Sequence, residues 1–174
     1  MKLKILIILL IGLIISCSTT KTSSIITENY NKEQDVTTLT LIPSGNILIP
    51  GQWTKTKFNE LSKQHFFTNK ESHSIAVAKN PQKTYPFYSE NTSNEKFVRS
   101  FFKWEKEYYE KQGFKINEKE SGDNYVIWTA KANNVNTIFL YGAKNNFAYN
   151  FSILTDDLSE SKRVKFLKEL FQEN

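Results

Sequence analysis

The candidate catalytic bases of this chain are two histidines, since nucleophilic and acid–base catalysis both need a base held beside its partner. His65 and His73 fall in one predicted hairpin, whose turn is expected at residues 69–72. In that register Thr68 faces His73 and His65 lies near Ala76, so the two rings should not converge on a metal ion. The six glycines form neither a phosphate-binding loop nor a dinucleotide-binding fingerprint. We therefore expect no metal ion and no other cofactor.

Glu105 is the charged residue whose position most needs an explanation. A helix is predicted over residues 95–112, and at 100° per residue Glu105 falls within its apolar face. Its helical neighbours on that face are Phe101, Phe102, Tyr108 and Tyr109. We expect the carboxyl group to point toward a sheet and to be substantially buried, where it needs a hydrogen-bonding partner. Two interpretations stay open: an anchor that fixes the helix on the sheet, or a general acid or ligand contact in a cleft.

An aromatic loop precedes this helix. Tyr85, Phe87 and Tyr88 follow one another in an irregular segment that Pro81 and Pro86 hold extended. Such a loop can offer a rigid surface to a peptide, a glycan or a lipid. The alternative is that the three rings complete a hydrophobic core by covering the sheet.

The N-terminus reads as an export signal. Lys2 and Lys4 precede an apolar run over residues 5–15, which is far shorter than the roughly 20 residues that a spanning helix needs. A small residue then precedes Cys17, the only cysteine of the chain, in a pattern that resembles the lipobox of bacterial lipoproteins. We therefore predict a lipoprotein signal peptide over residues 1–16 and lipidation of Cys17, by acyl chains such as palmitate, as the membrane anchor.

The segment after Cys17 has the composition of a solvated linker, rich in Ser, Thr, Lys and Asn. We predict a flexible tether over residues 17–36. Because no acidic residue follows the cysteine closely, resemblance to the sorting rules of Gram-negative bacteria implies the periplasmic face of the outer membrane. The formal net charge is +5, but the lysines are interspersed with glutamates, so we do not expect binding to nucleic acid.

Residues 37–174 should form one α+β domain. Four antiparallel strands in succession are predicted over residues 114–154, where β-branched and aromatic residues alternate between turn residues. Shorter strands are expected at residues 38–42, 47–49, 53–58, 65–68 and 74–79. A second helix begins near a capping box formed by Asp157 and Glu160. Together these elements predict an antiparallel sheet of about six or seven strands covered by two helices.

Three short motifs in this order carry a family resemblance. They are Ile49-Pro50-Gly51-Gln52-Trp53 at a strand entry, Phe66-Phe67 before a hairpin, and Phe139-Leu140-Tyr141-Gly142. Over residues 47–171 the order of elements resembles the PsbP-like fold, which implies an α/β/α sandwich. The resemblance also implies an accessory or binding role without catalysis, and it supplies no metal ligand.

These observations favour a non-catalytic, membrane-anchored envelope lipoprotein that serves as a binding or assembly accessory module. Its expected partners are the membrane, through the N-terminal lipid, and either an envelope protein or a small apolar ligand. The alternative is a small periplasmic hydrolase or isomerase that uses a carboxylate in a cleft.

Overall fold

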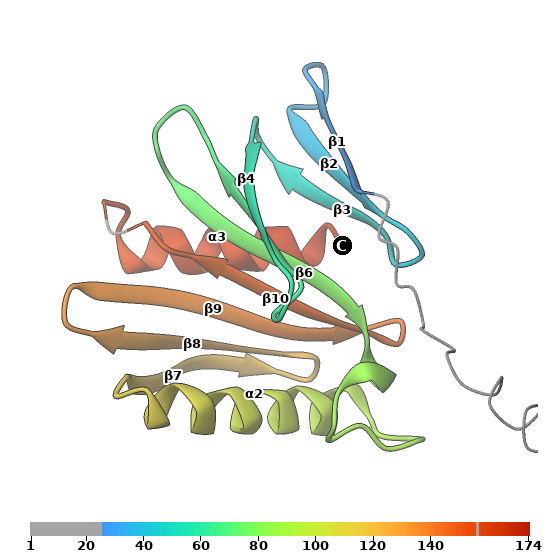
Figure 1. The fold of residues 1–174 in the computed structure, drawn as a ribbon, viewed down its shortest axis with the longest axis vertical. Helices are drawn as coiled ribbons and strands as arrows, with labels where there is room; N and C mark the ends of the chain where they lie inside the picture. Colours follow the sequence, from blue (N-terminus) through green and yellow to red (C-terminus); the bar gives the residue numbers. More distant parts are fainter. Residues whose placement is uncertain (1–25, 156) are drawn as a thin grey trace, which may run out of the picture.

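The computed structural model describes residues 26–155 and 157–174 (Figure 1). The predicted signal peptide, Cys17 and residues 17–25 of the predicted tether lie outside the described residues. Within the described part of the chain, no helix combines the length and apolar character needed to cross a membrane.

The main sheet is antiparallel throughout and has seven strands within the described ranges. Its strands, in spatial order, are β4 (Thr54–Asn59), β5 (Gln64–Thr68), β6 (Ser74–Pro81), β10 (Phe147–Ile153), β9 (Val135–Lys144), β8 (Tyr125–Ala132) and β7 (Lys115–Gly122). The four successive strands predicted over residues 114–154 are confirmed as β7 to β10. The lysine-rich β4 is an edge strand, where charged side chains discourage pairing with another chain.

Two helices cover opposite faces of this sheet (Figure 1). Alternate side chains of β8 separate the two cores: Val126 and Trp128 pack under α2 (Asn94–Lys111), whereas Ile127 packs on the side of α3 (Glu160–Gln172). The α2 core is dominated by stacked aromatic rings, and the α3 core by aliphatic side chains. The predicted α+β class, with an antiparallel sheet and two helices, is confirmed.

A second, three-stranded sheet was not predicted as a separate unit. It consists of β1 (Ile26–Asn31), β2 (Val36–Leu41) and β3 (Gly45–Pro50), and its apolar side chains join the α3 core. The predicted tether is therefore wrong for residues 26–36, because β1 pairs with β2 along its whole length. Most side chains of β1 are exposed. The polar composition of this segment correctly predicts that its side chains are exposed, but it says nothing about whether its backbone pairs with another strand.

Both helices begin at a serine cap, and the start of α3 differs from the predicted capping box. Ser93 caps α2, where its hydroxyl accepts a hydrogen bond from the Lys96 backbone N–H at 3.3 Å. Ser159 rather than Asp157 caps α3 in the same way. A serine nearer each helix provides the acceptor oxygen that the first turn requires. Gly113 follows α2 with a φ of +84°, a backbone conformation that glycine commonly supplies where a helix ends.

Candidate functional site

The edge of the main sheet has a step beside α2. β5 pairs with β6 only from Ser74 to Val77, whereas β6 continues to Pro81 and is paired there with β10 alone. The turn between β4 and β5, residues 60–63, leaves the sheet at this point. A cavity of about 380 Å³ lies at the step, and we call it the step cavity.

The walls of the step cavity come from segments far apart in the sequence. One wall is the 41–44 turn and the β4–β5 hairpin, a second is the end of β6 with the η1 helix (Gln82–Thr84) and the loop after it, and a third is α2. The lining mixes apolar and aromatic side chains with polar and charged ones. Among them are Ser44, Phe58, Leu61, Lys63, His65, Lys79, Asn80, Tyr85, Trp104, Glu105 and Asn150.

Glu105 enters this cavity from α2, where its side chain is partly buried. Desolvation raises the pKa of its carboxyl group to about 7, and a hydrogen-bonding interaction with Tyr141 opposes that rise. The contact falls short of regular hydrogen-bond geometry, so the buried Tyr141 hydroxyl has no partner at full hydrogen-bond distance and angle. Glu105 therefore changes its charge near neutral pH, in a position open to a ligand.

His65 lines the opposite wall and is 3% exposed. Its ring stacks on Phe58 with centroids 4.5 Å apart, and its buried Nδ1 has no hydrogen-bond partner. Desolvation, with a smaller contribution from the Lys55 charge, lowers the pKa of His65 to about 4, so the imidazole is neutral at physiological pH. The predicted register was one residue out: His65 lies opposite Val77 and not near Ala76, because the connection between the two strands is one residue longer than expected and Thr68 pairs with Ser74.

The predicted recognition loop divides into three different environments. Tyr85 lines the step cavity, and its hydroxyl accepts a hydrogen bond from the Asn80 side-chain amide at 3.3 Å. Phe87 packs on Phe97 of α2 with ring centroids 5.2 Å apart, and so contributes to the core. Tyr88 is 38% exposed and does not line the cavity. Of the three aromatic residues, Tyr85 alone is brought to the same cavity as Glu105.

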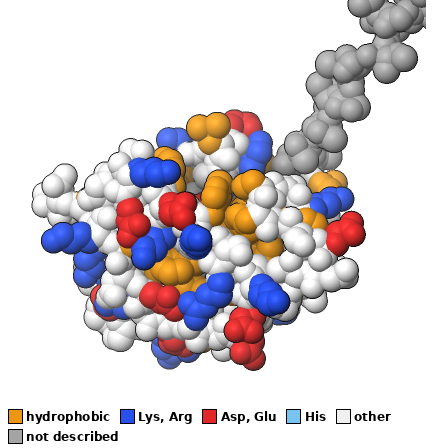
Figure 2. Space-filling model, turned by 90° about the horizontal axis from the view of Figure 1, so that it is seen from below, with side chains coloured by type: hydrophobic (Ala, Val, Ile, Leu, Met, Phe, Trp, Pro, Cys, Tyr) orange, Lys and Arg blue, Asp and Glu red, His pale blue; other side chains and the backbone are white. Residues whose placement is uncertain are grey.

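Exposed aromatic residues continue from the cavity onto the surface of α2. Figure 2 looks onto the molecule from the α2 side and shows apolar side chains gathered between lysines and acidic residues. Trp104 is 45% exposed and Tyr108 is 59% exposed, one helical turn further along. Leu61, at the tip of the β4–β5 hairpin, is 97% exposed and also lines the cavity. Exposed apolar side chains, Leu61 and Trp104, therefore contribute to the lining of the cavity.

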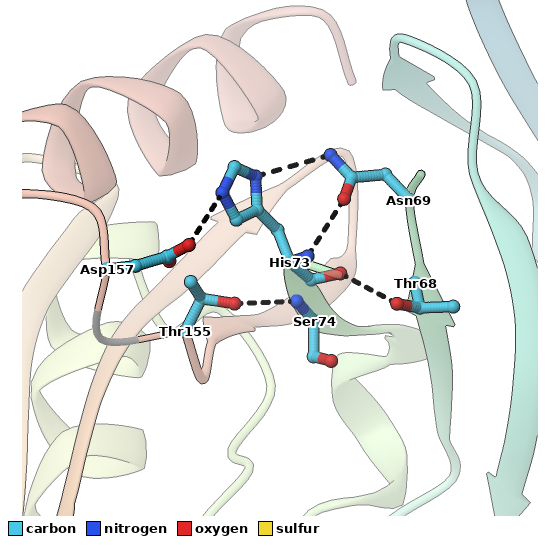
Figure 3. A network of polar contacts seen from close by, with 6 residues as sticks. All are labelled: Thr68, Asn69, His73, Ser74, Thr155 and Asp157. Carbon is cyan, nitrogen blue, oxygen red and sulfur yellow. Dashed lines mark hydrogen bonds and ion pairs between the residues drawn. The ribbon is translucent and has the colours of Figure 1, made fainter. Parts of the chain in front are cut away.

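His73 belongs to a separate polar network (Figure 3). Its Nε2 lies 3.4 Å from an Asp157 carboxylate oxygen, and its Nδ1 lies 3.3 Å from the Asn69 side-chain nitrogen. Nearby, the Ser74 backbone N–H donates to the Thr155 hydroxyl at 2.7 Å. Both ring nitrogens of His73 are engaged, so neither is placed to activate a nucleophile. The network joins the β5–β6 turn to the segment between β10 and α3.

Metal ligation finds no support in the described ranges, where no group of three or more His, Cys, Asp or Glu side chains could hold an ion. Sequence reasoning did not assign His65 and Trp104 to a site. For His65, the signal was its position two residues before Phe67, because residues two apart on a strand share a face. Trp104 could have been found as the immediate neighbour of Glu105.

Fold and cavity together define an α+β domain with an apolar cavity at a step in its sheet edge. No family model matches this sequence, and no curated protein matches it. Among solved structures, the chain is similar to cyanobacterial PsbP (CyanoP) from Synechocystis sp. PCC 6803, with 10% sequence identity, a TM-score of 0.41, and coverage of 90% of this chain and 92% of that chain. This likeness is one of overall shape, and it carries no inference about function.

Proposed function

We propose that this protein is a non-catalytic, lipid-anchored module of the cell envelope, and that it binds a small apolar ligand in the step cavity. The observation that carries the proposal is the cavity itself. Its volume of about 380 Å³ falls in the range of small-molecule sites, and its walls combine aliphatic and aromatic side chains with polar groups, among them Glu105 and Asn150. That combination is typical of sites that bury an apolar body and orient it by one or two hydrogen bonds.

The anchor in this proposal is Cys17, followed by a linker that reaches the folded residues from Ile26 onward. Lipidation at that cysteine would hold the cavity near a membrane. The absence of acidic residues directly after Cys17 supports the periplasmic face of the outer membrane.

Binding is favoured over catalysis by how the titratable groups are arranged. Glu105 and His65 lie on different walls of the cavity, and within the described residues no contact joins them. The lowered pKa of His65, about 4, makes its imidazole a weak base, and its buried Nδ1 has no partner to orient the ring. The second candidate, a small hydrolase or isomerase, is supported by one observation: the pKa of Glu105, about 7, suits a general acid or base at neutral pH.

The test is recovery of the bound molecule. The protein is purified from membranes without denaturation, and mass spectrometry identifies small molecules that co-purify in stoichiometric amount. Ser44 lines the cavity without a side-chain hydrogen bond, so Ser44→Trp should fill it and remove the ligand. Ser89→Trp, on the exposed part of the aromatic loop, is the matched control and should retain the ligand.

Three outcomes discriminate between the candidates. An apolar molecule lost from Ser44→Trp and kept in Ser89→Trp supports the binding module. A molecule that the purified wild-type protein converts, and Glu105→Gln does not, supports the enzyme. In the third outcome, an envelope protein co-purifies equally well with the wild type and with Ser44→Trp. That result would reject both candidates in favour of an assembly role through another surface.

A further inference from the structure

The inner end of the step cavity holds a carboxylate that lacks a cationic partner within the described part of the chain. Glu105 forms no ion pair there, and its polar interaction is the weak contact with the Tyr141 hydroxyl. A partly buried carboxylate in this setting is poorly solvated and gains from any cation that enters.

Aromatic rings line the same cavity. Trp104 and Tyr85 both line the cavity, and their rings meet edge to face with centroids 6.3 Å apart. Phe58 lines the opposite wall. The face of an aromatic ring attracts an organic cation through its quadrupole, and tryptophan does so most strongly.

We propose that the step cavity binds an organic cation, with an alkylated ammonium group held between the Glu105 carboxylate and the rings of Tyr85 and Trp104. The apolar remainder of the ligand would lie along the hairpin wall beside Phe58 and Leu61. This inference rests on the proposed function, because it names the class of ligand that the same cavity takes.

The two lysines that line the cavity do not reverse its preference for a cation over an anion. The Lys63 ammonium group pairs with Glu60 at 3.1 Å. The Lys79 ammonium group donates to the Asn46 carbonyl at 3.2 Å and stands 4.9 Å from the centre of the Phe147 ring. Both ammonium groups are engaged away from Glu105, whereas an anionic ligand would meet the Glu105 charge directly.

Binding of a cation should depend on pH through Glu105. The groups that face it are Tyr85 from the loop, Tyr109 from α2 and Tyr141 from β9, and the pKa of each phenol is raised by burial above its ordinary value. His65, across the cavity, is neutral at this pH. Among these groups, Glu105 is therefore the one that titrates between pH 6 and pH 8, where its ionised fraction rises about tenfold.

The experiment compares choline with 3,3-dimethylbutan-1-ol, which has the same shape without the charge. Both are titrated calorimetrically into the full-length protein in a non-ionic detergent at pH 6 and pH 8. We expect choline to bind at least tenfold more tightly than the neutral alcohol at pH 8, and about tenfold more weakly at pH 6 than at pH 8. Equal affinities for the two probes would overturn the inference.

Two variants assign the effect to named groups. Glu105→Gln should reduce choline affinity about tenfold and remove its pH dependence, whereas the exposed Glu107→Gln on the same helix should change neither. Trp104→Leu, at a residue 45% exposed, should weaken choline binding without unfolding the protein, and it tests the aromatic contact if Glu105→Gln fails to fold. An unchanged choline affinity in Trp104→Leu would contradict the proposal.

The outcomes also separate this inference from the proposed function. Binding of both probes without preference for charge, lost in Ser44→Trp, would remove the cation and keep the apolar-ligand module. Binding of neither probe to the wild-type protein would overturn the cation inference, whereas the proposed function would fall only if no apolar molecule is recovered that Ser44→Trp removes.

Discussion

The ring of Tyr141 lies flat against the ring of Phe101, with centroids 4.2 Å apart and planes 10° apart. This stack holds the Tyr141 hydroxyl, fully buried, on the α2 side of the sheet, where Glu105 is the carboxylate that interacts with it. Because the hydroxyl position is set by the stack, a change at Glu105 leaves a buried polar group behind.

Glu105→Ala should therefore destabilise the fold at pH 5, where the carboxyl group is protonated. We expect a loss of about 1 to 3 kcal/mol in the free energy of unfolding, since the buried Tyr141 hydroxyl loses its polar contact with the carboxyl group. Glu105→Gln keeps a polar side chain and should be mild. Chemical denaturation of both variants measures this, and an alanine variant with unchanged stability would remove the anchor role.

Stability should fall as pH rises through the range in which Glu105 ionises. The pKa of this group is raised from 4.5 to about 7 in the folded protein, so its favourable contribution is fully present below pH 4.5 and is lost by about pH 7. The expected loss is about 1 to 3 kcal/mol, reduced from the full linkage value by partial exposure. Glu105→Gln should flatten this part of the profile, whereas Glu107→Gln should leave it unchanged.

His65 should act at lower pH and with the opposite sign. Its pKa is lowered from 6.5 to about 4, so its contribution is present above pH 6.5 and is lost as pH falls toward 4. His65→Phe keeps an aromatic ring on Phe58 and should weaken acid destabilisation in that window. NMR titration of the His65 ring protons supplies the direct measurement, and a midpoint near 6.5 would contradict the burial argument.

Cys17→Ala should release the protein from the membrane without changing its fold. The anchor precedes the described residues, and the cores are built from residues after it. We expect the variant to leave the detergent phase in a phase-partition assay and to melt like the wild type. Acyl labelling that persists in Cys17→Ala would show that the lipid is attached elsewhere.

Truncation tests the role of β1. A chain that begins at Ile26 keeps the strand, whereas one that begins at Asp35 exposes the edge of β2 and loses the Tyr30–Asp35 hydrogen bond of 2.7 Å. We expect both to be soluble, with the shorter chain less stable by about 1 to 3 kcal/mol. Equal melting temperatures would mean that β1 adds nothing to the domain, as the predicted tether implied.

Sequence patterns predicted the elements better than the site. The alternation in β8 and the aromatic face of α2 are local signals, so the strands, the helices and the position of Glu105 could be inferred from spacing. The step cavity depends on where β5 stops pairing with β6, which is a relation between strands. His65 and Glu105 line the same cavity because of how these strands pair. A local sequence pattern carries no information about that pairing.

The step cavity brings together the 41–44 turn, the β4–β5 hairpin, the end of β6 and the middle of α2, which have no common neighbourhood in the unfolded chain. A ligand seated there would brace these four segments against one another, and each tenfold excess over its dissociation constant would add about 1.4 kcal/mol to the folded state. The melting temperature of the protein in its native envelope can be compared before and after small molecules are removed. The difference measures what fraction of the protein holds a ligand.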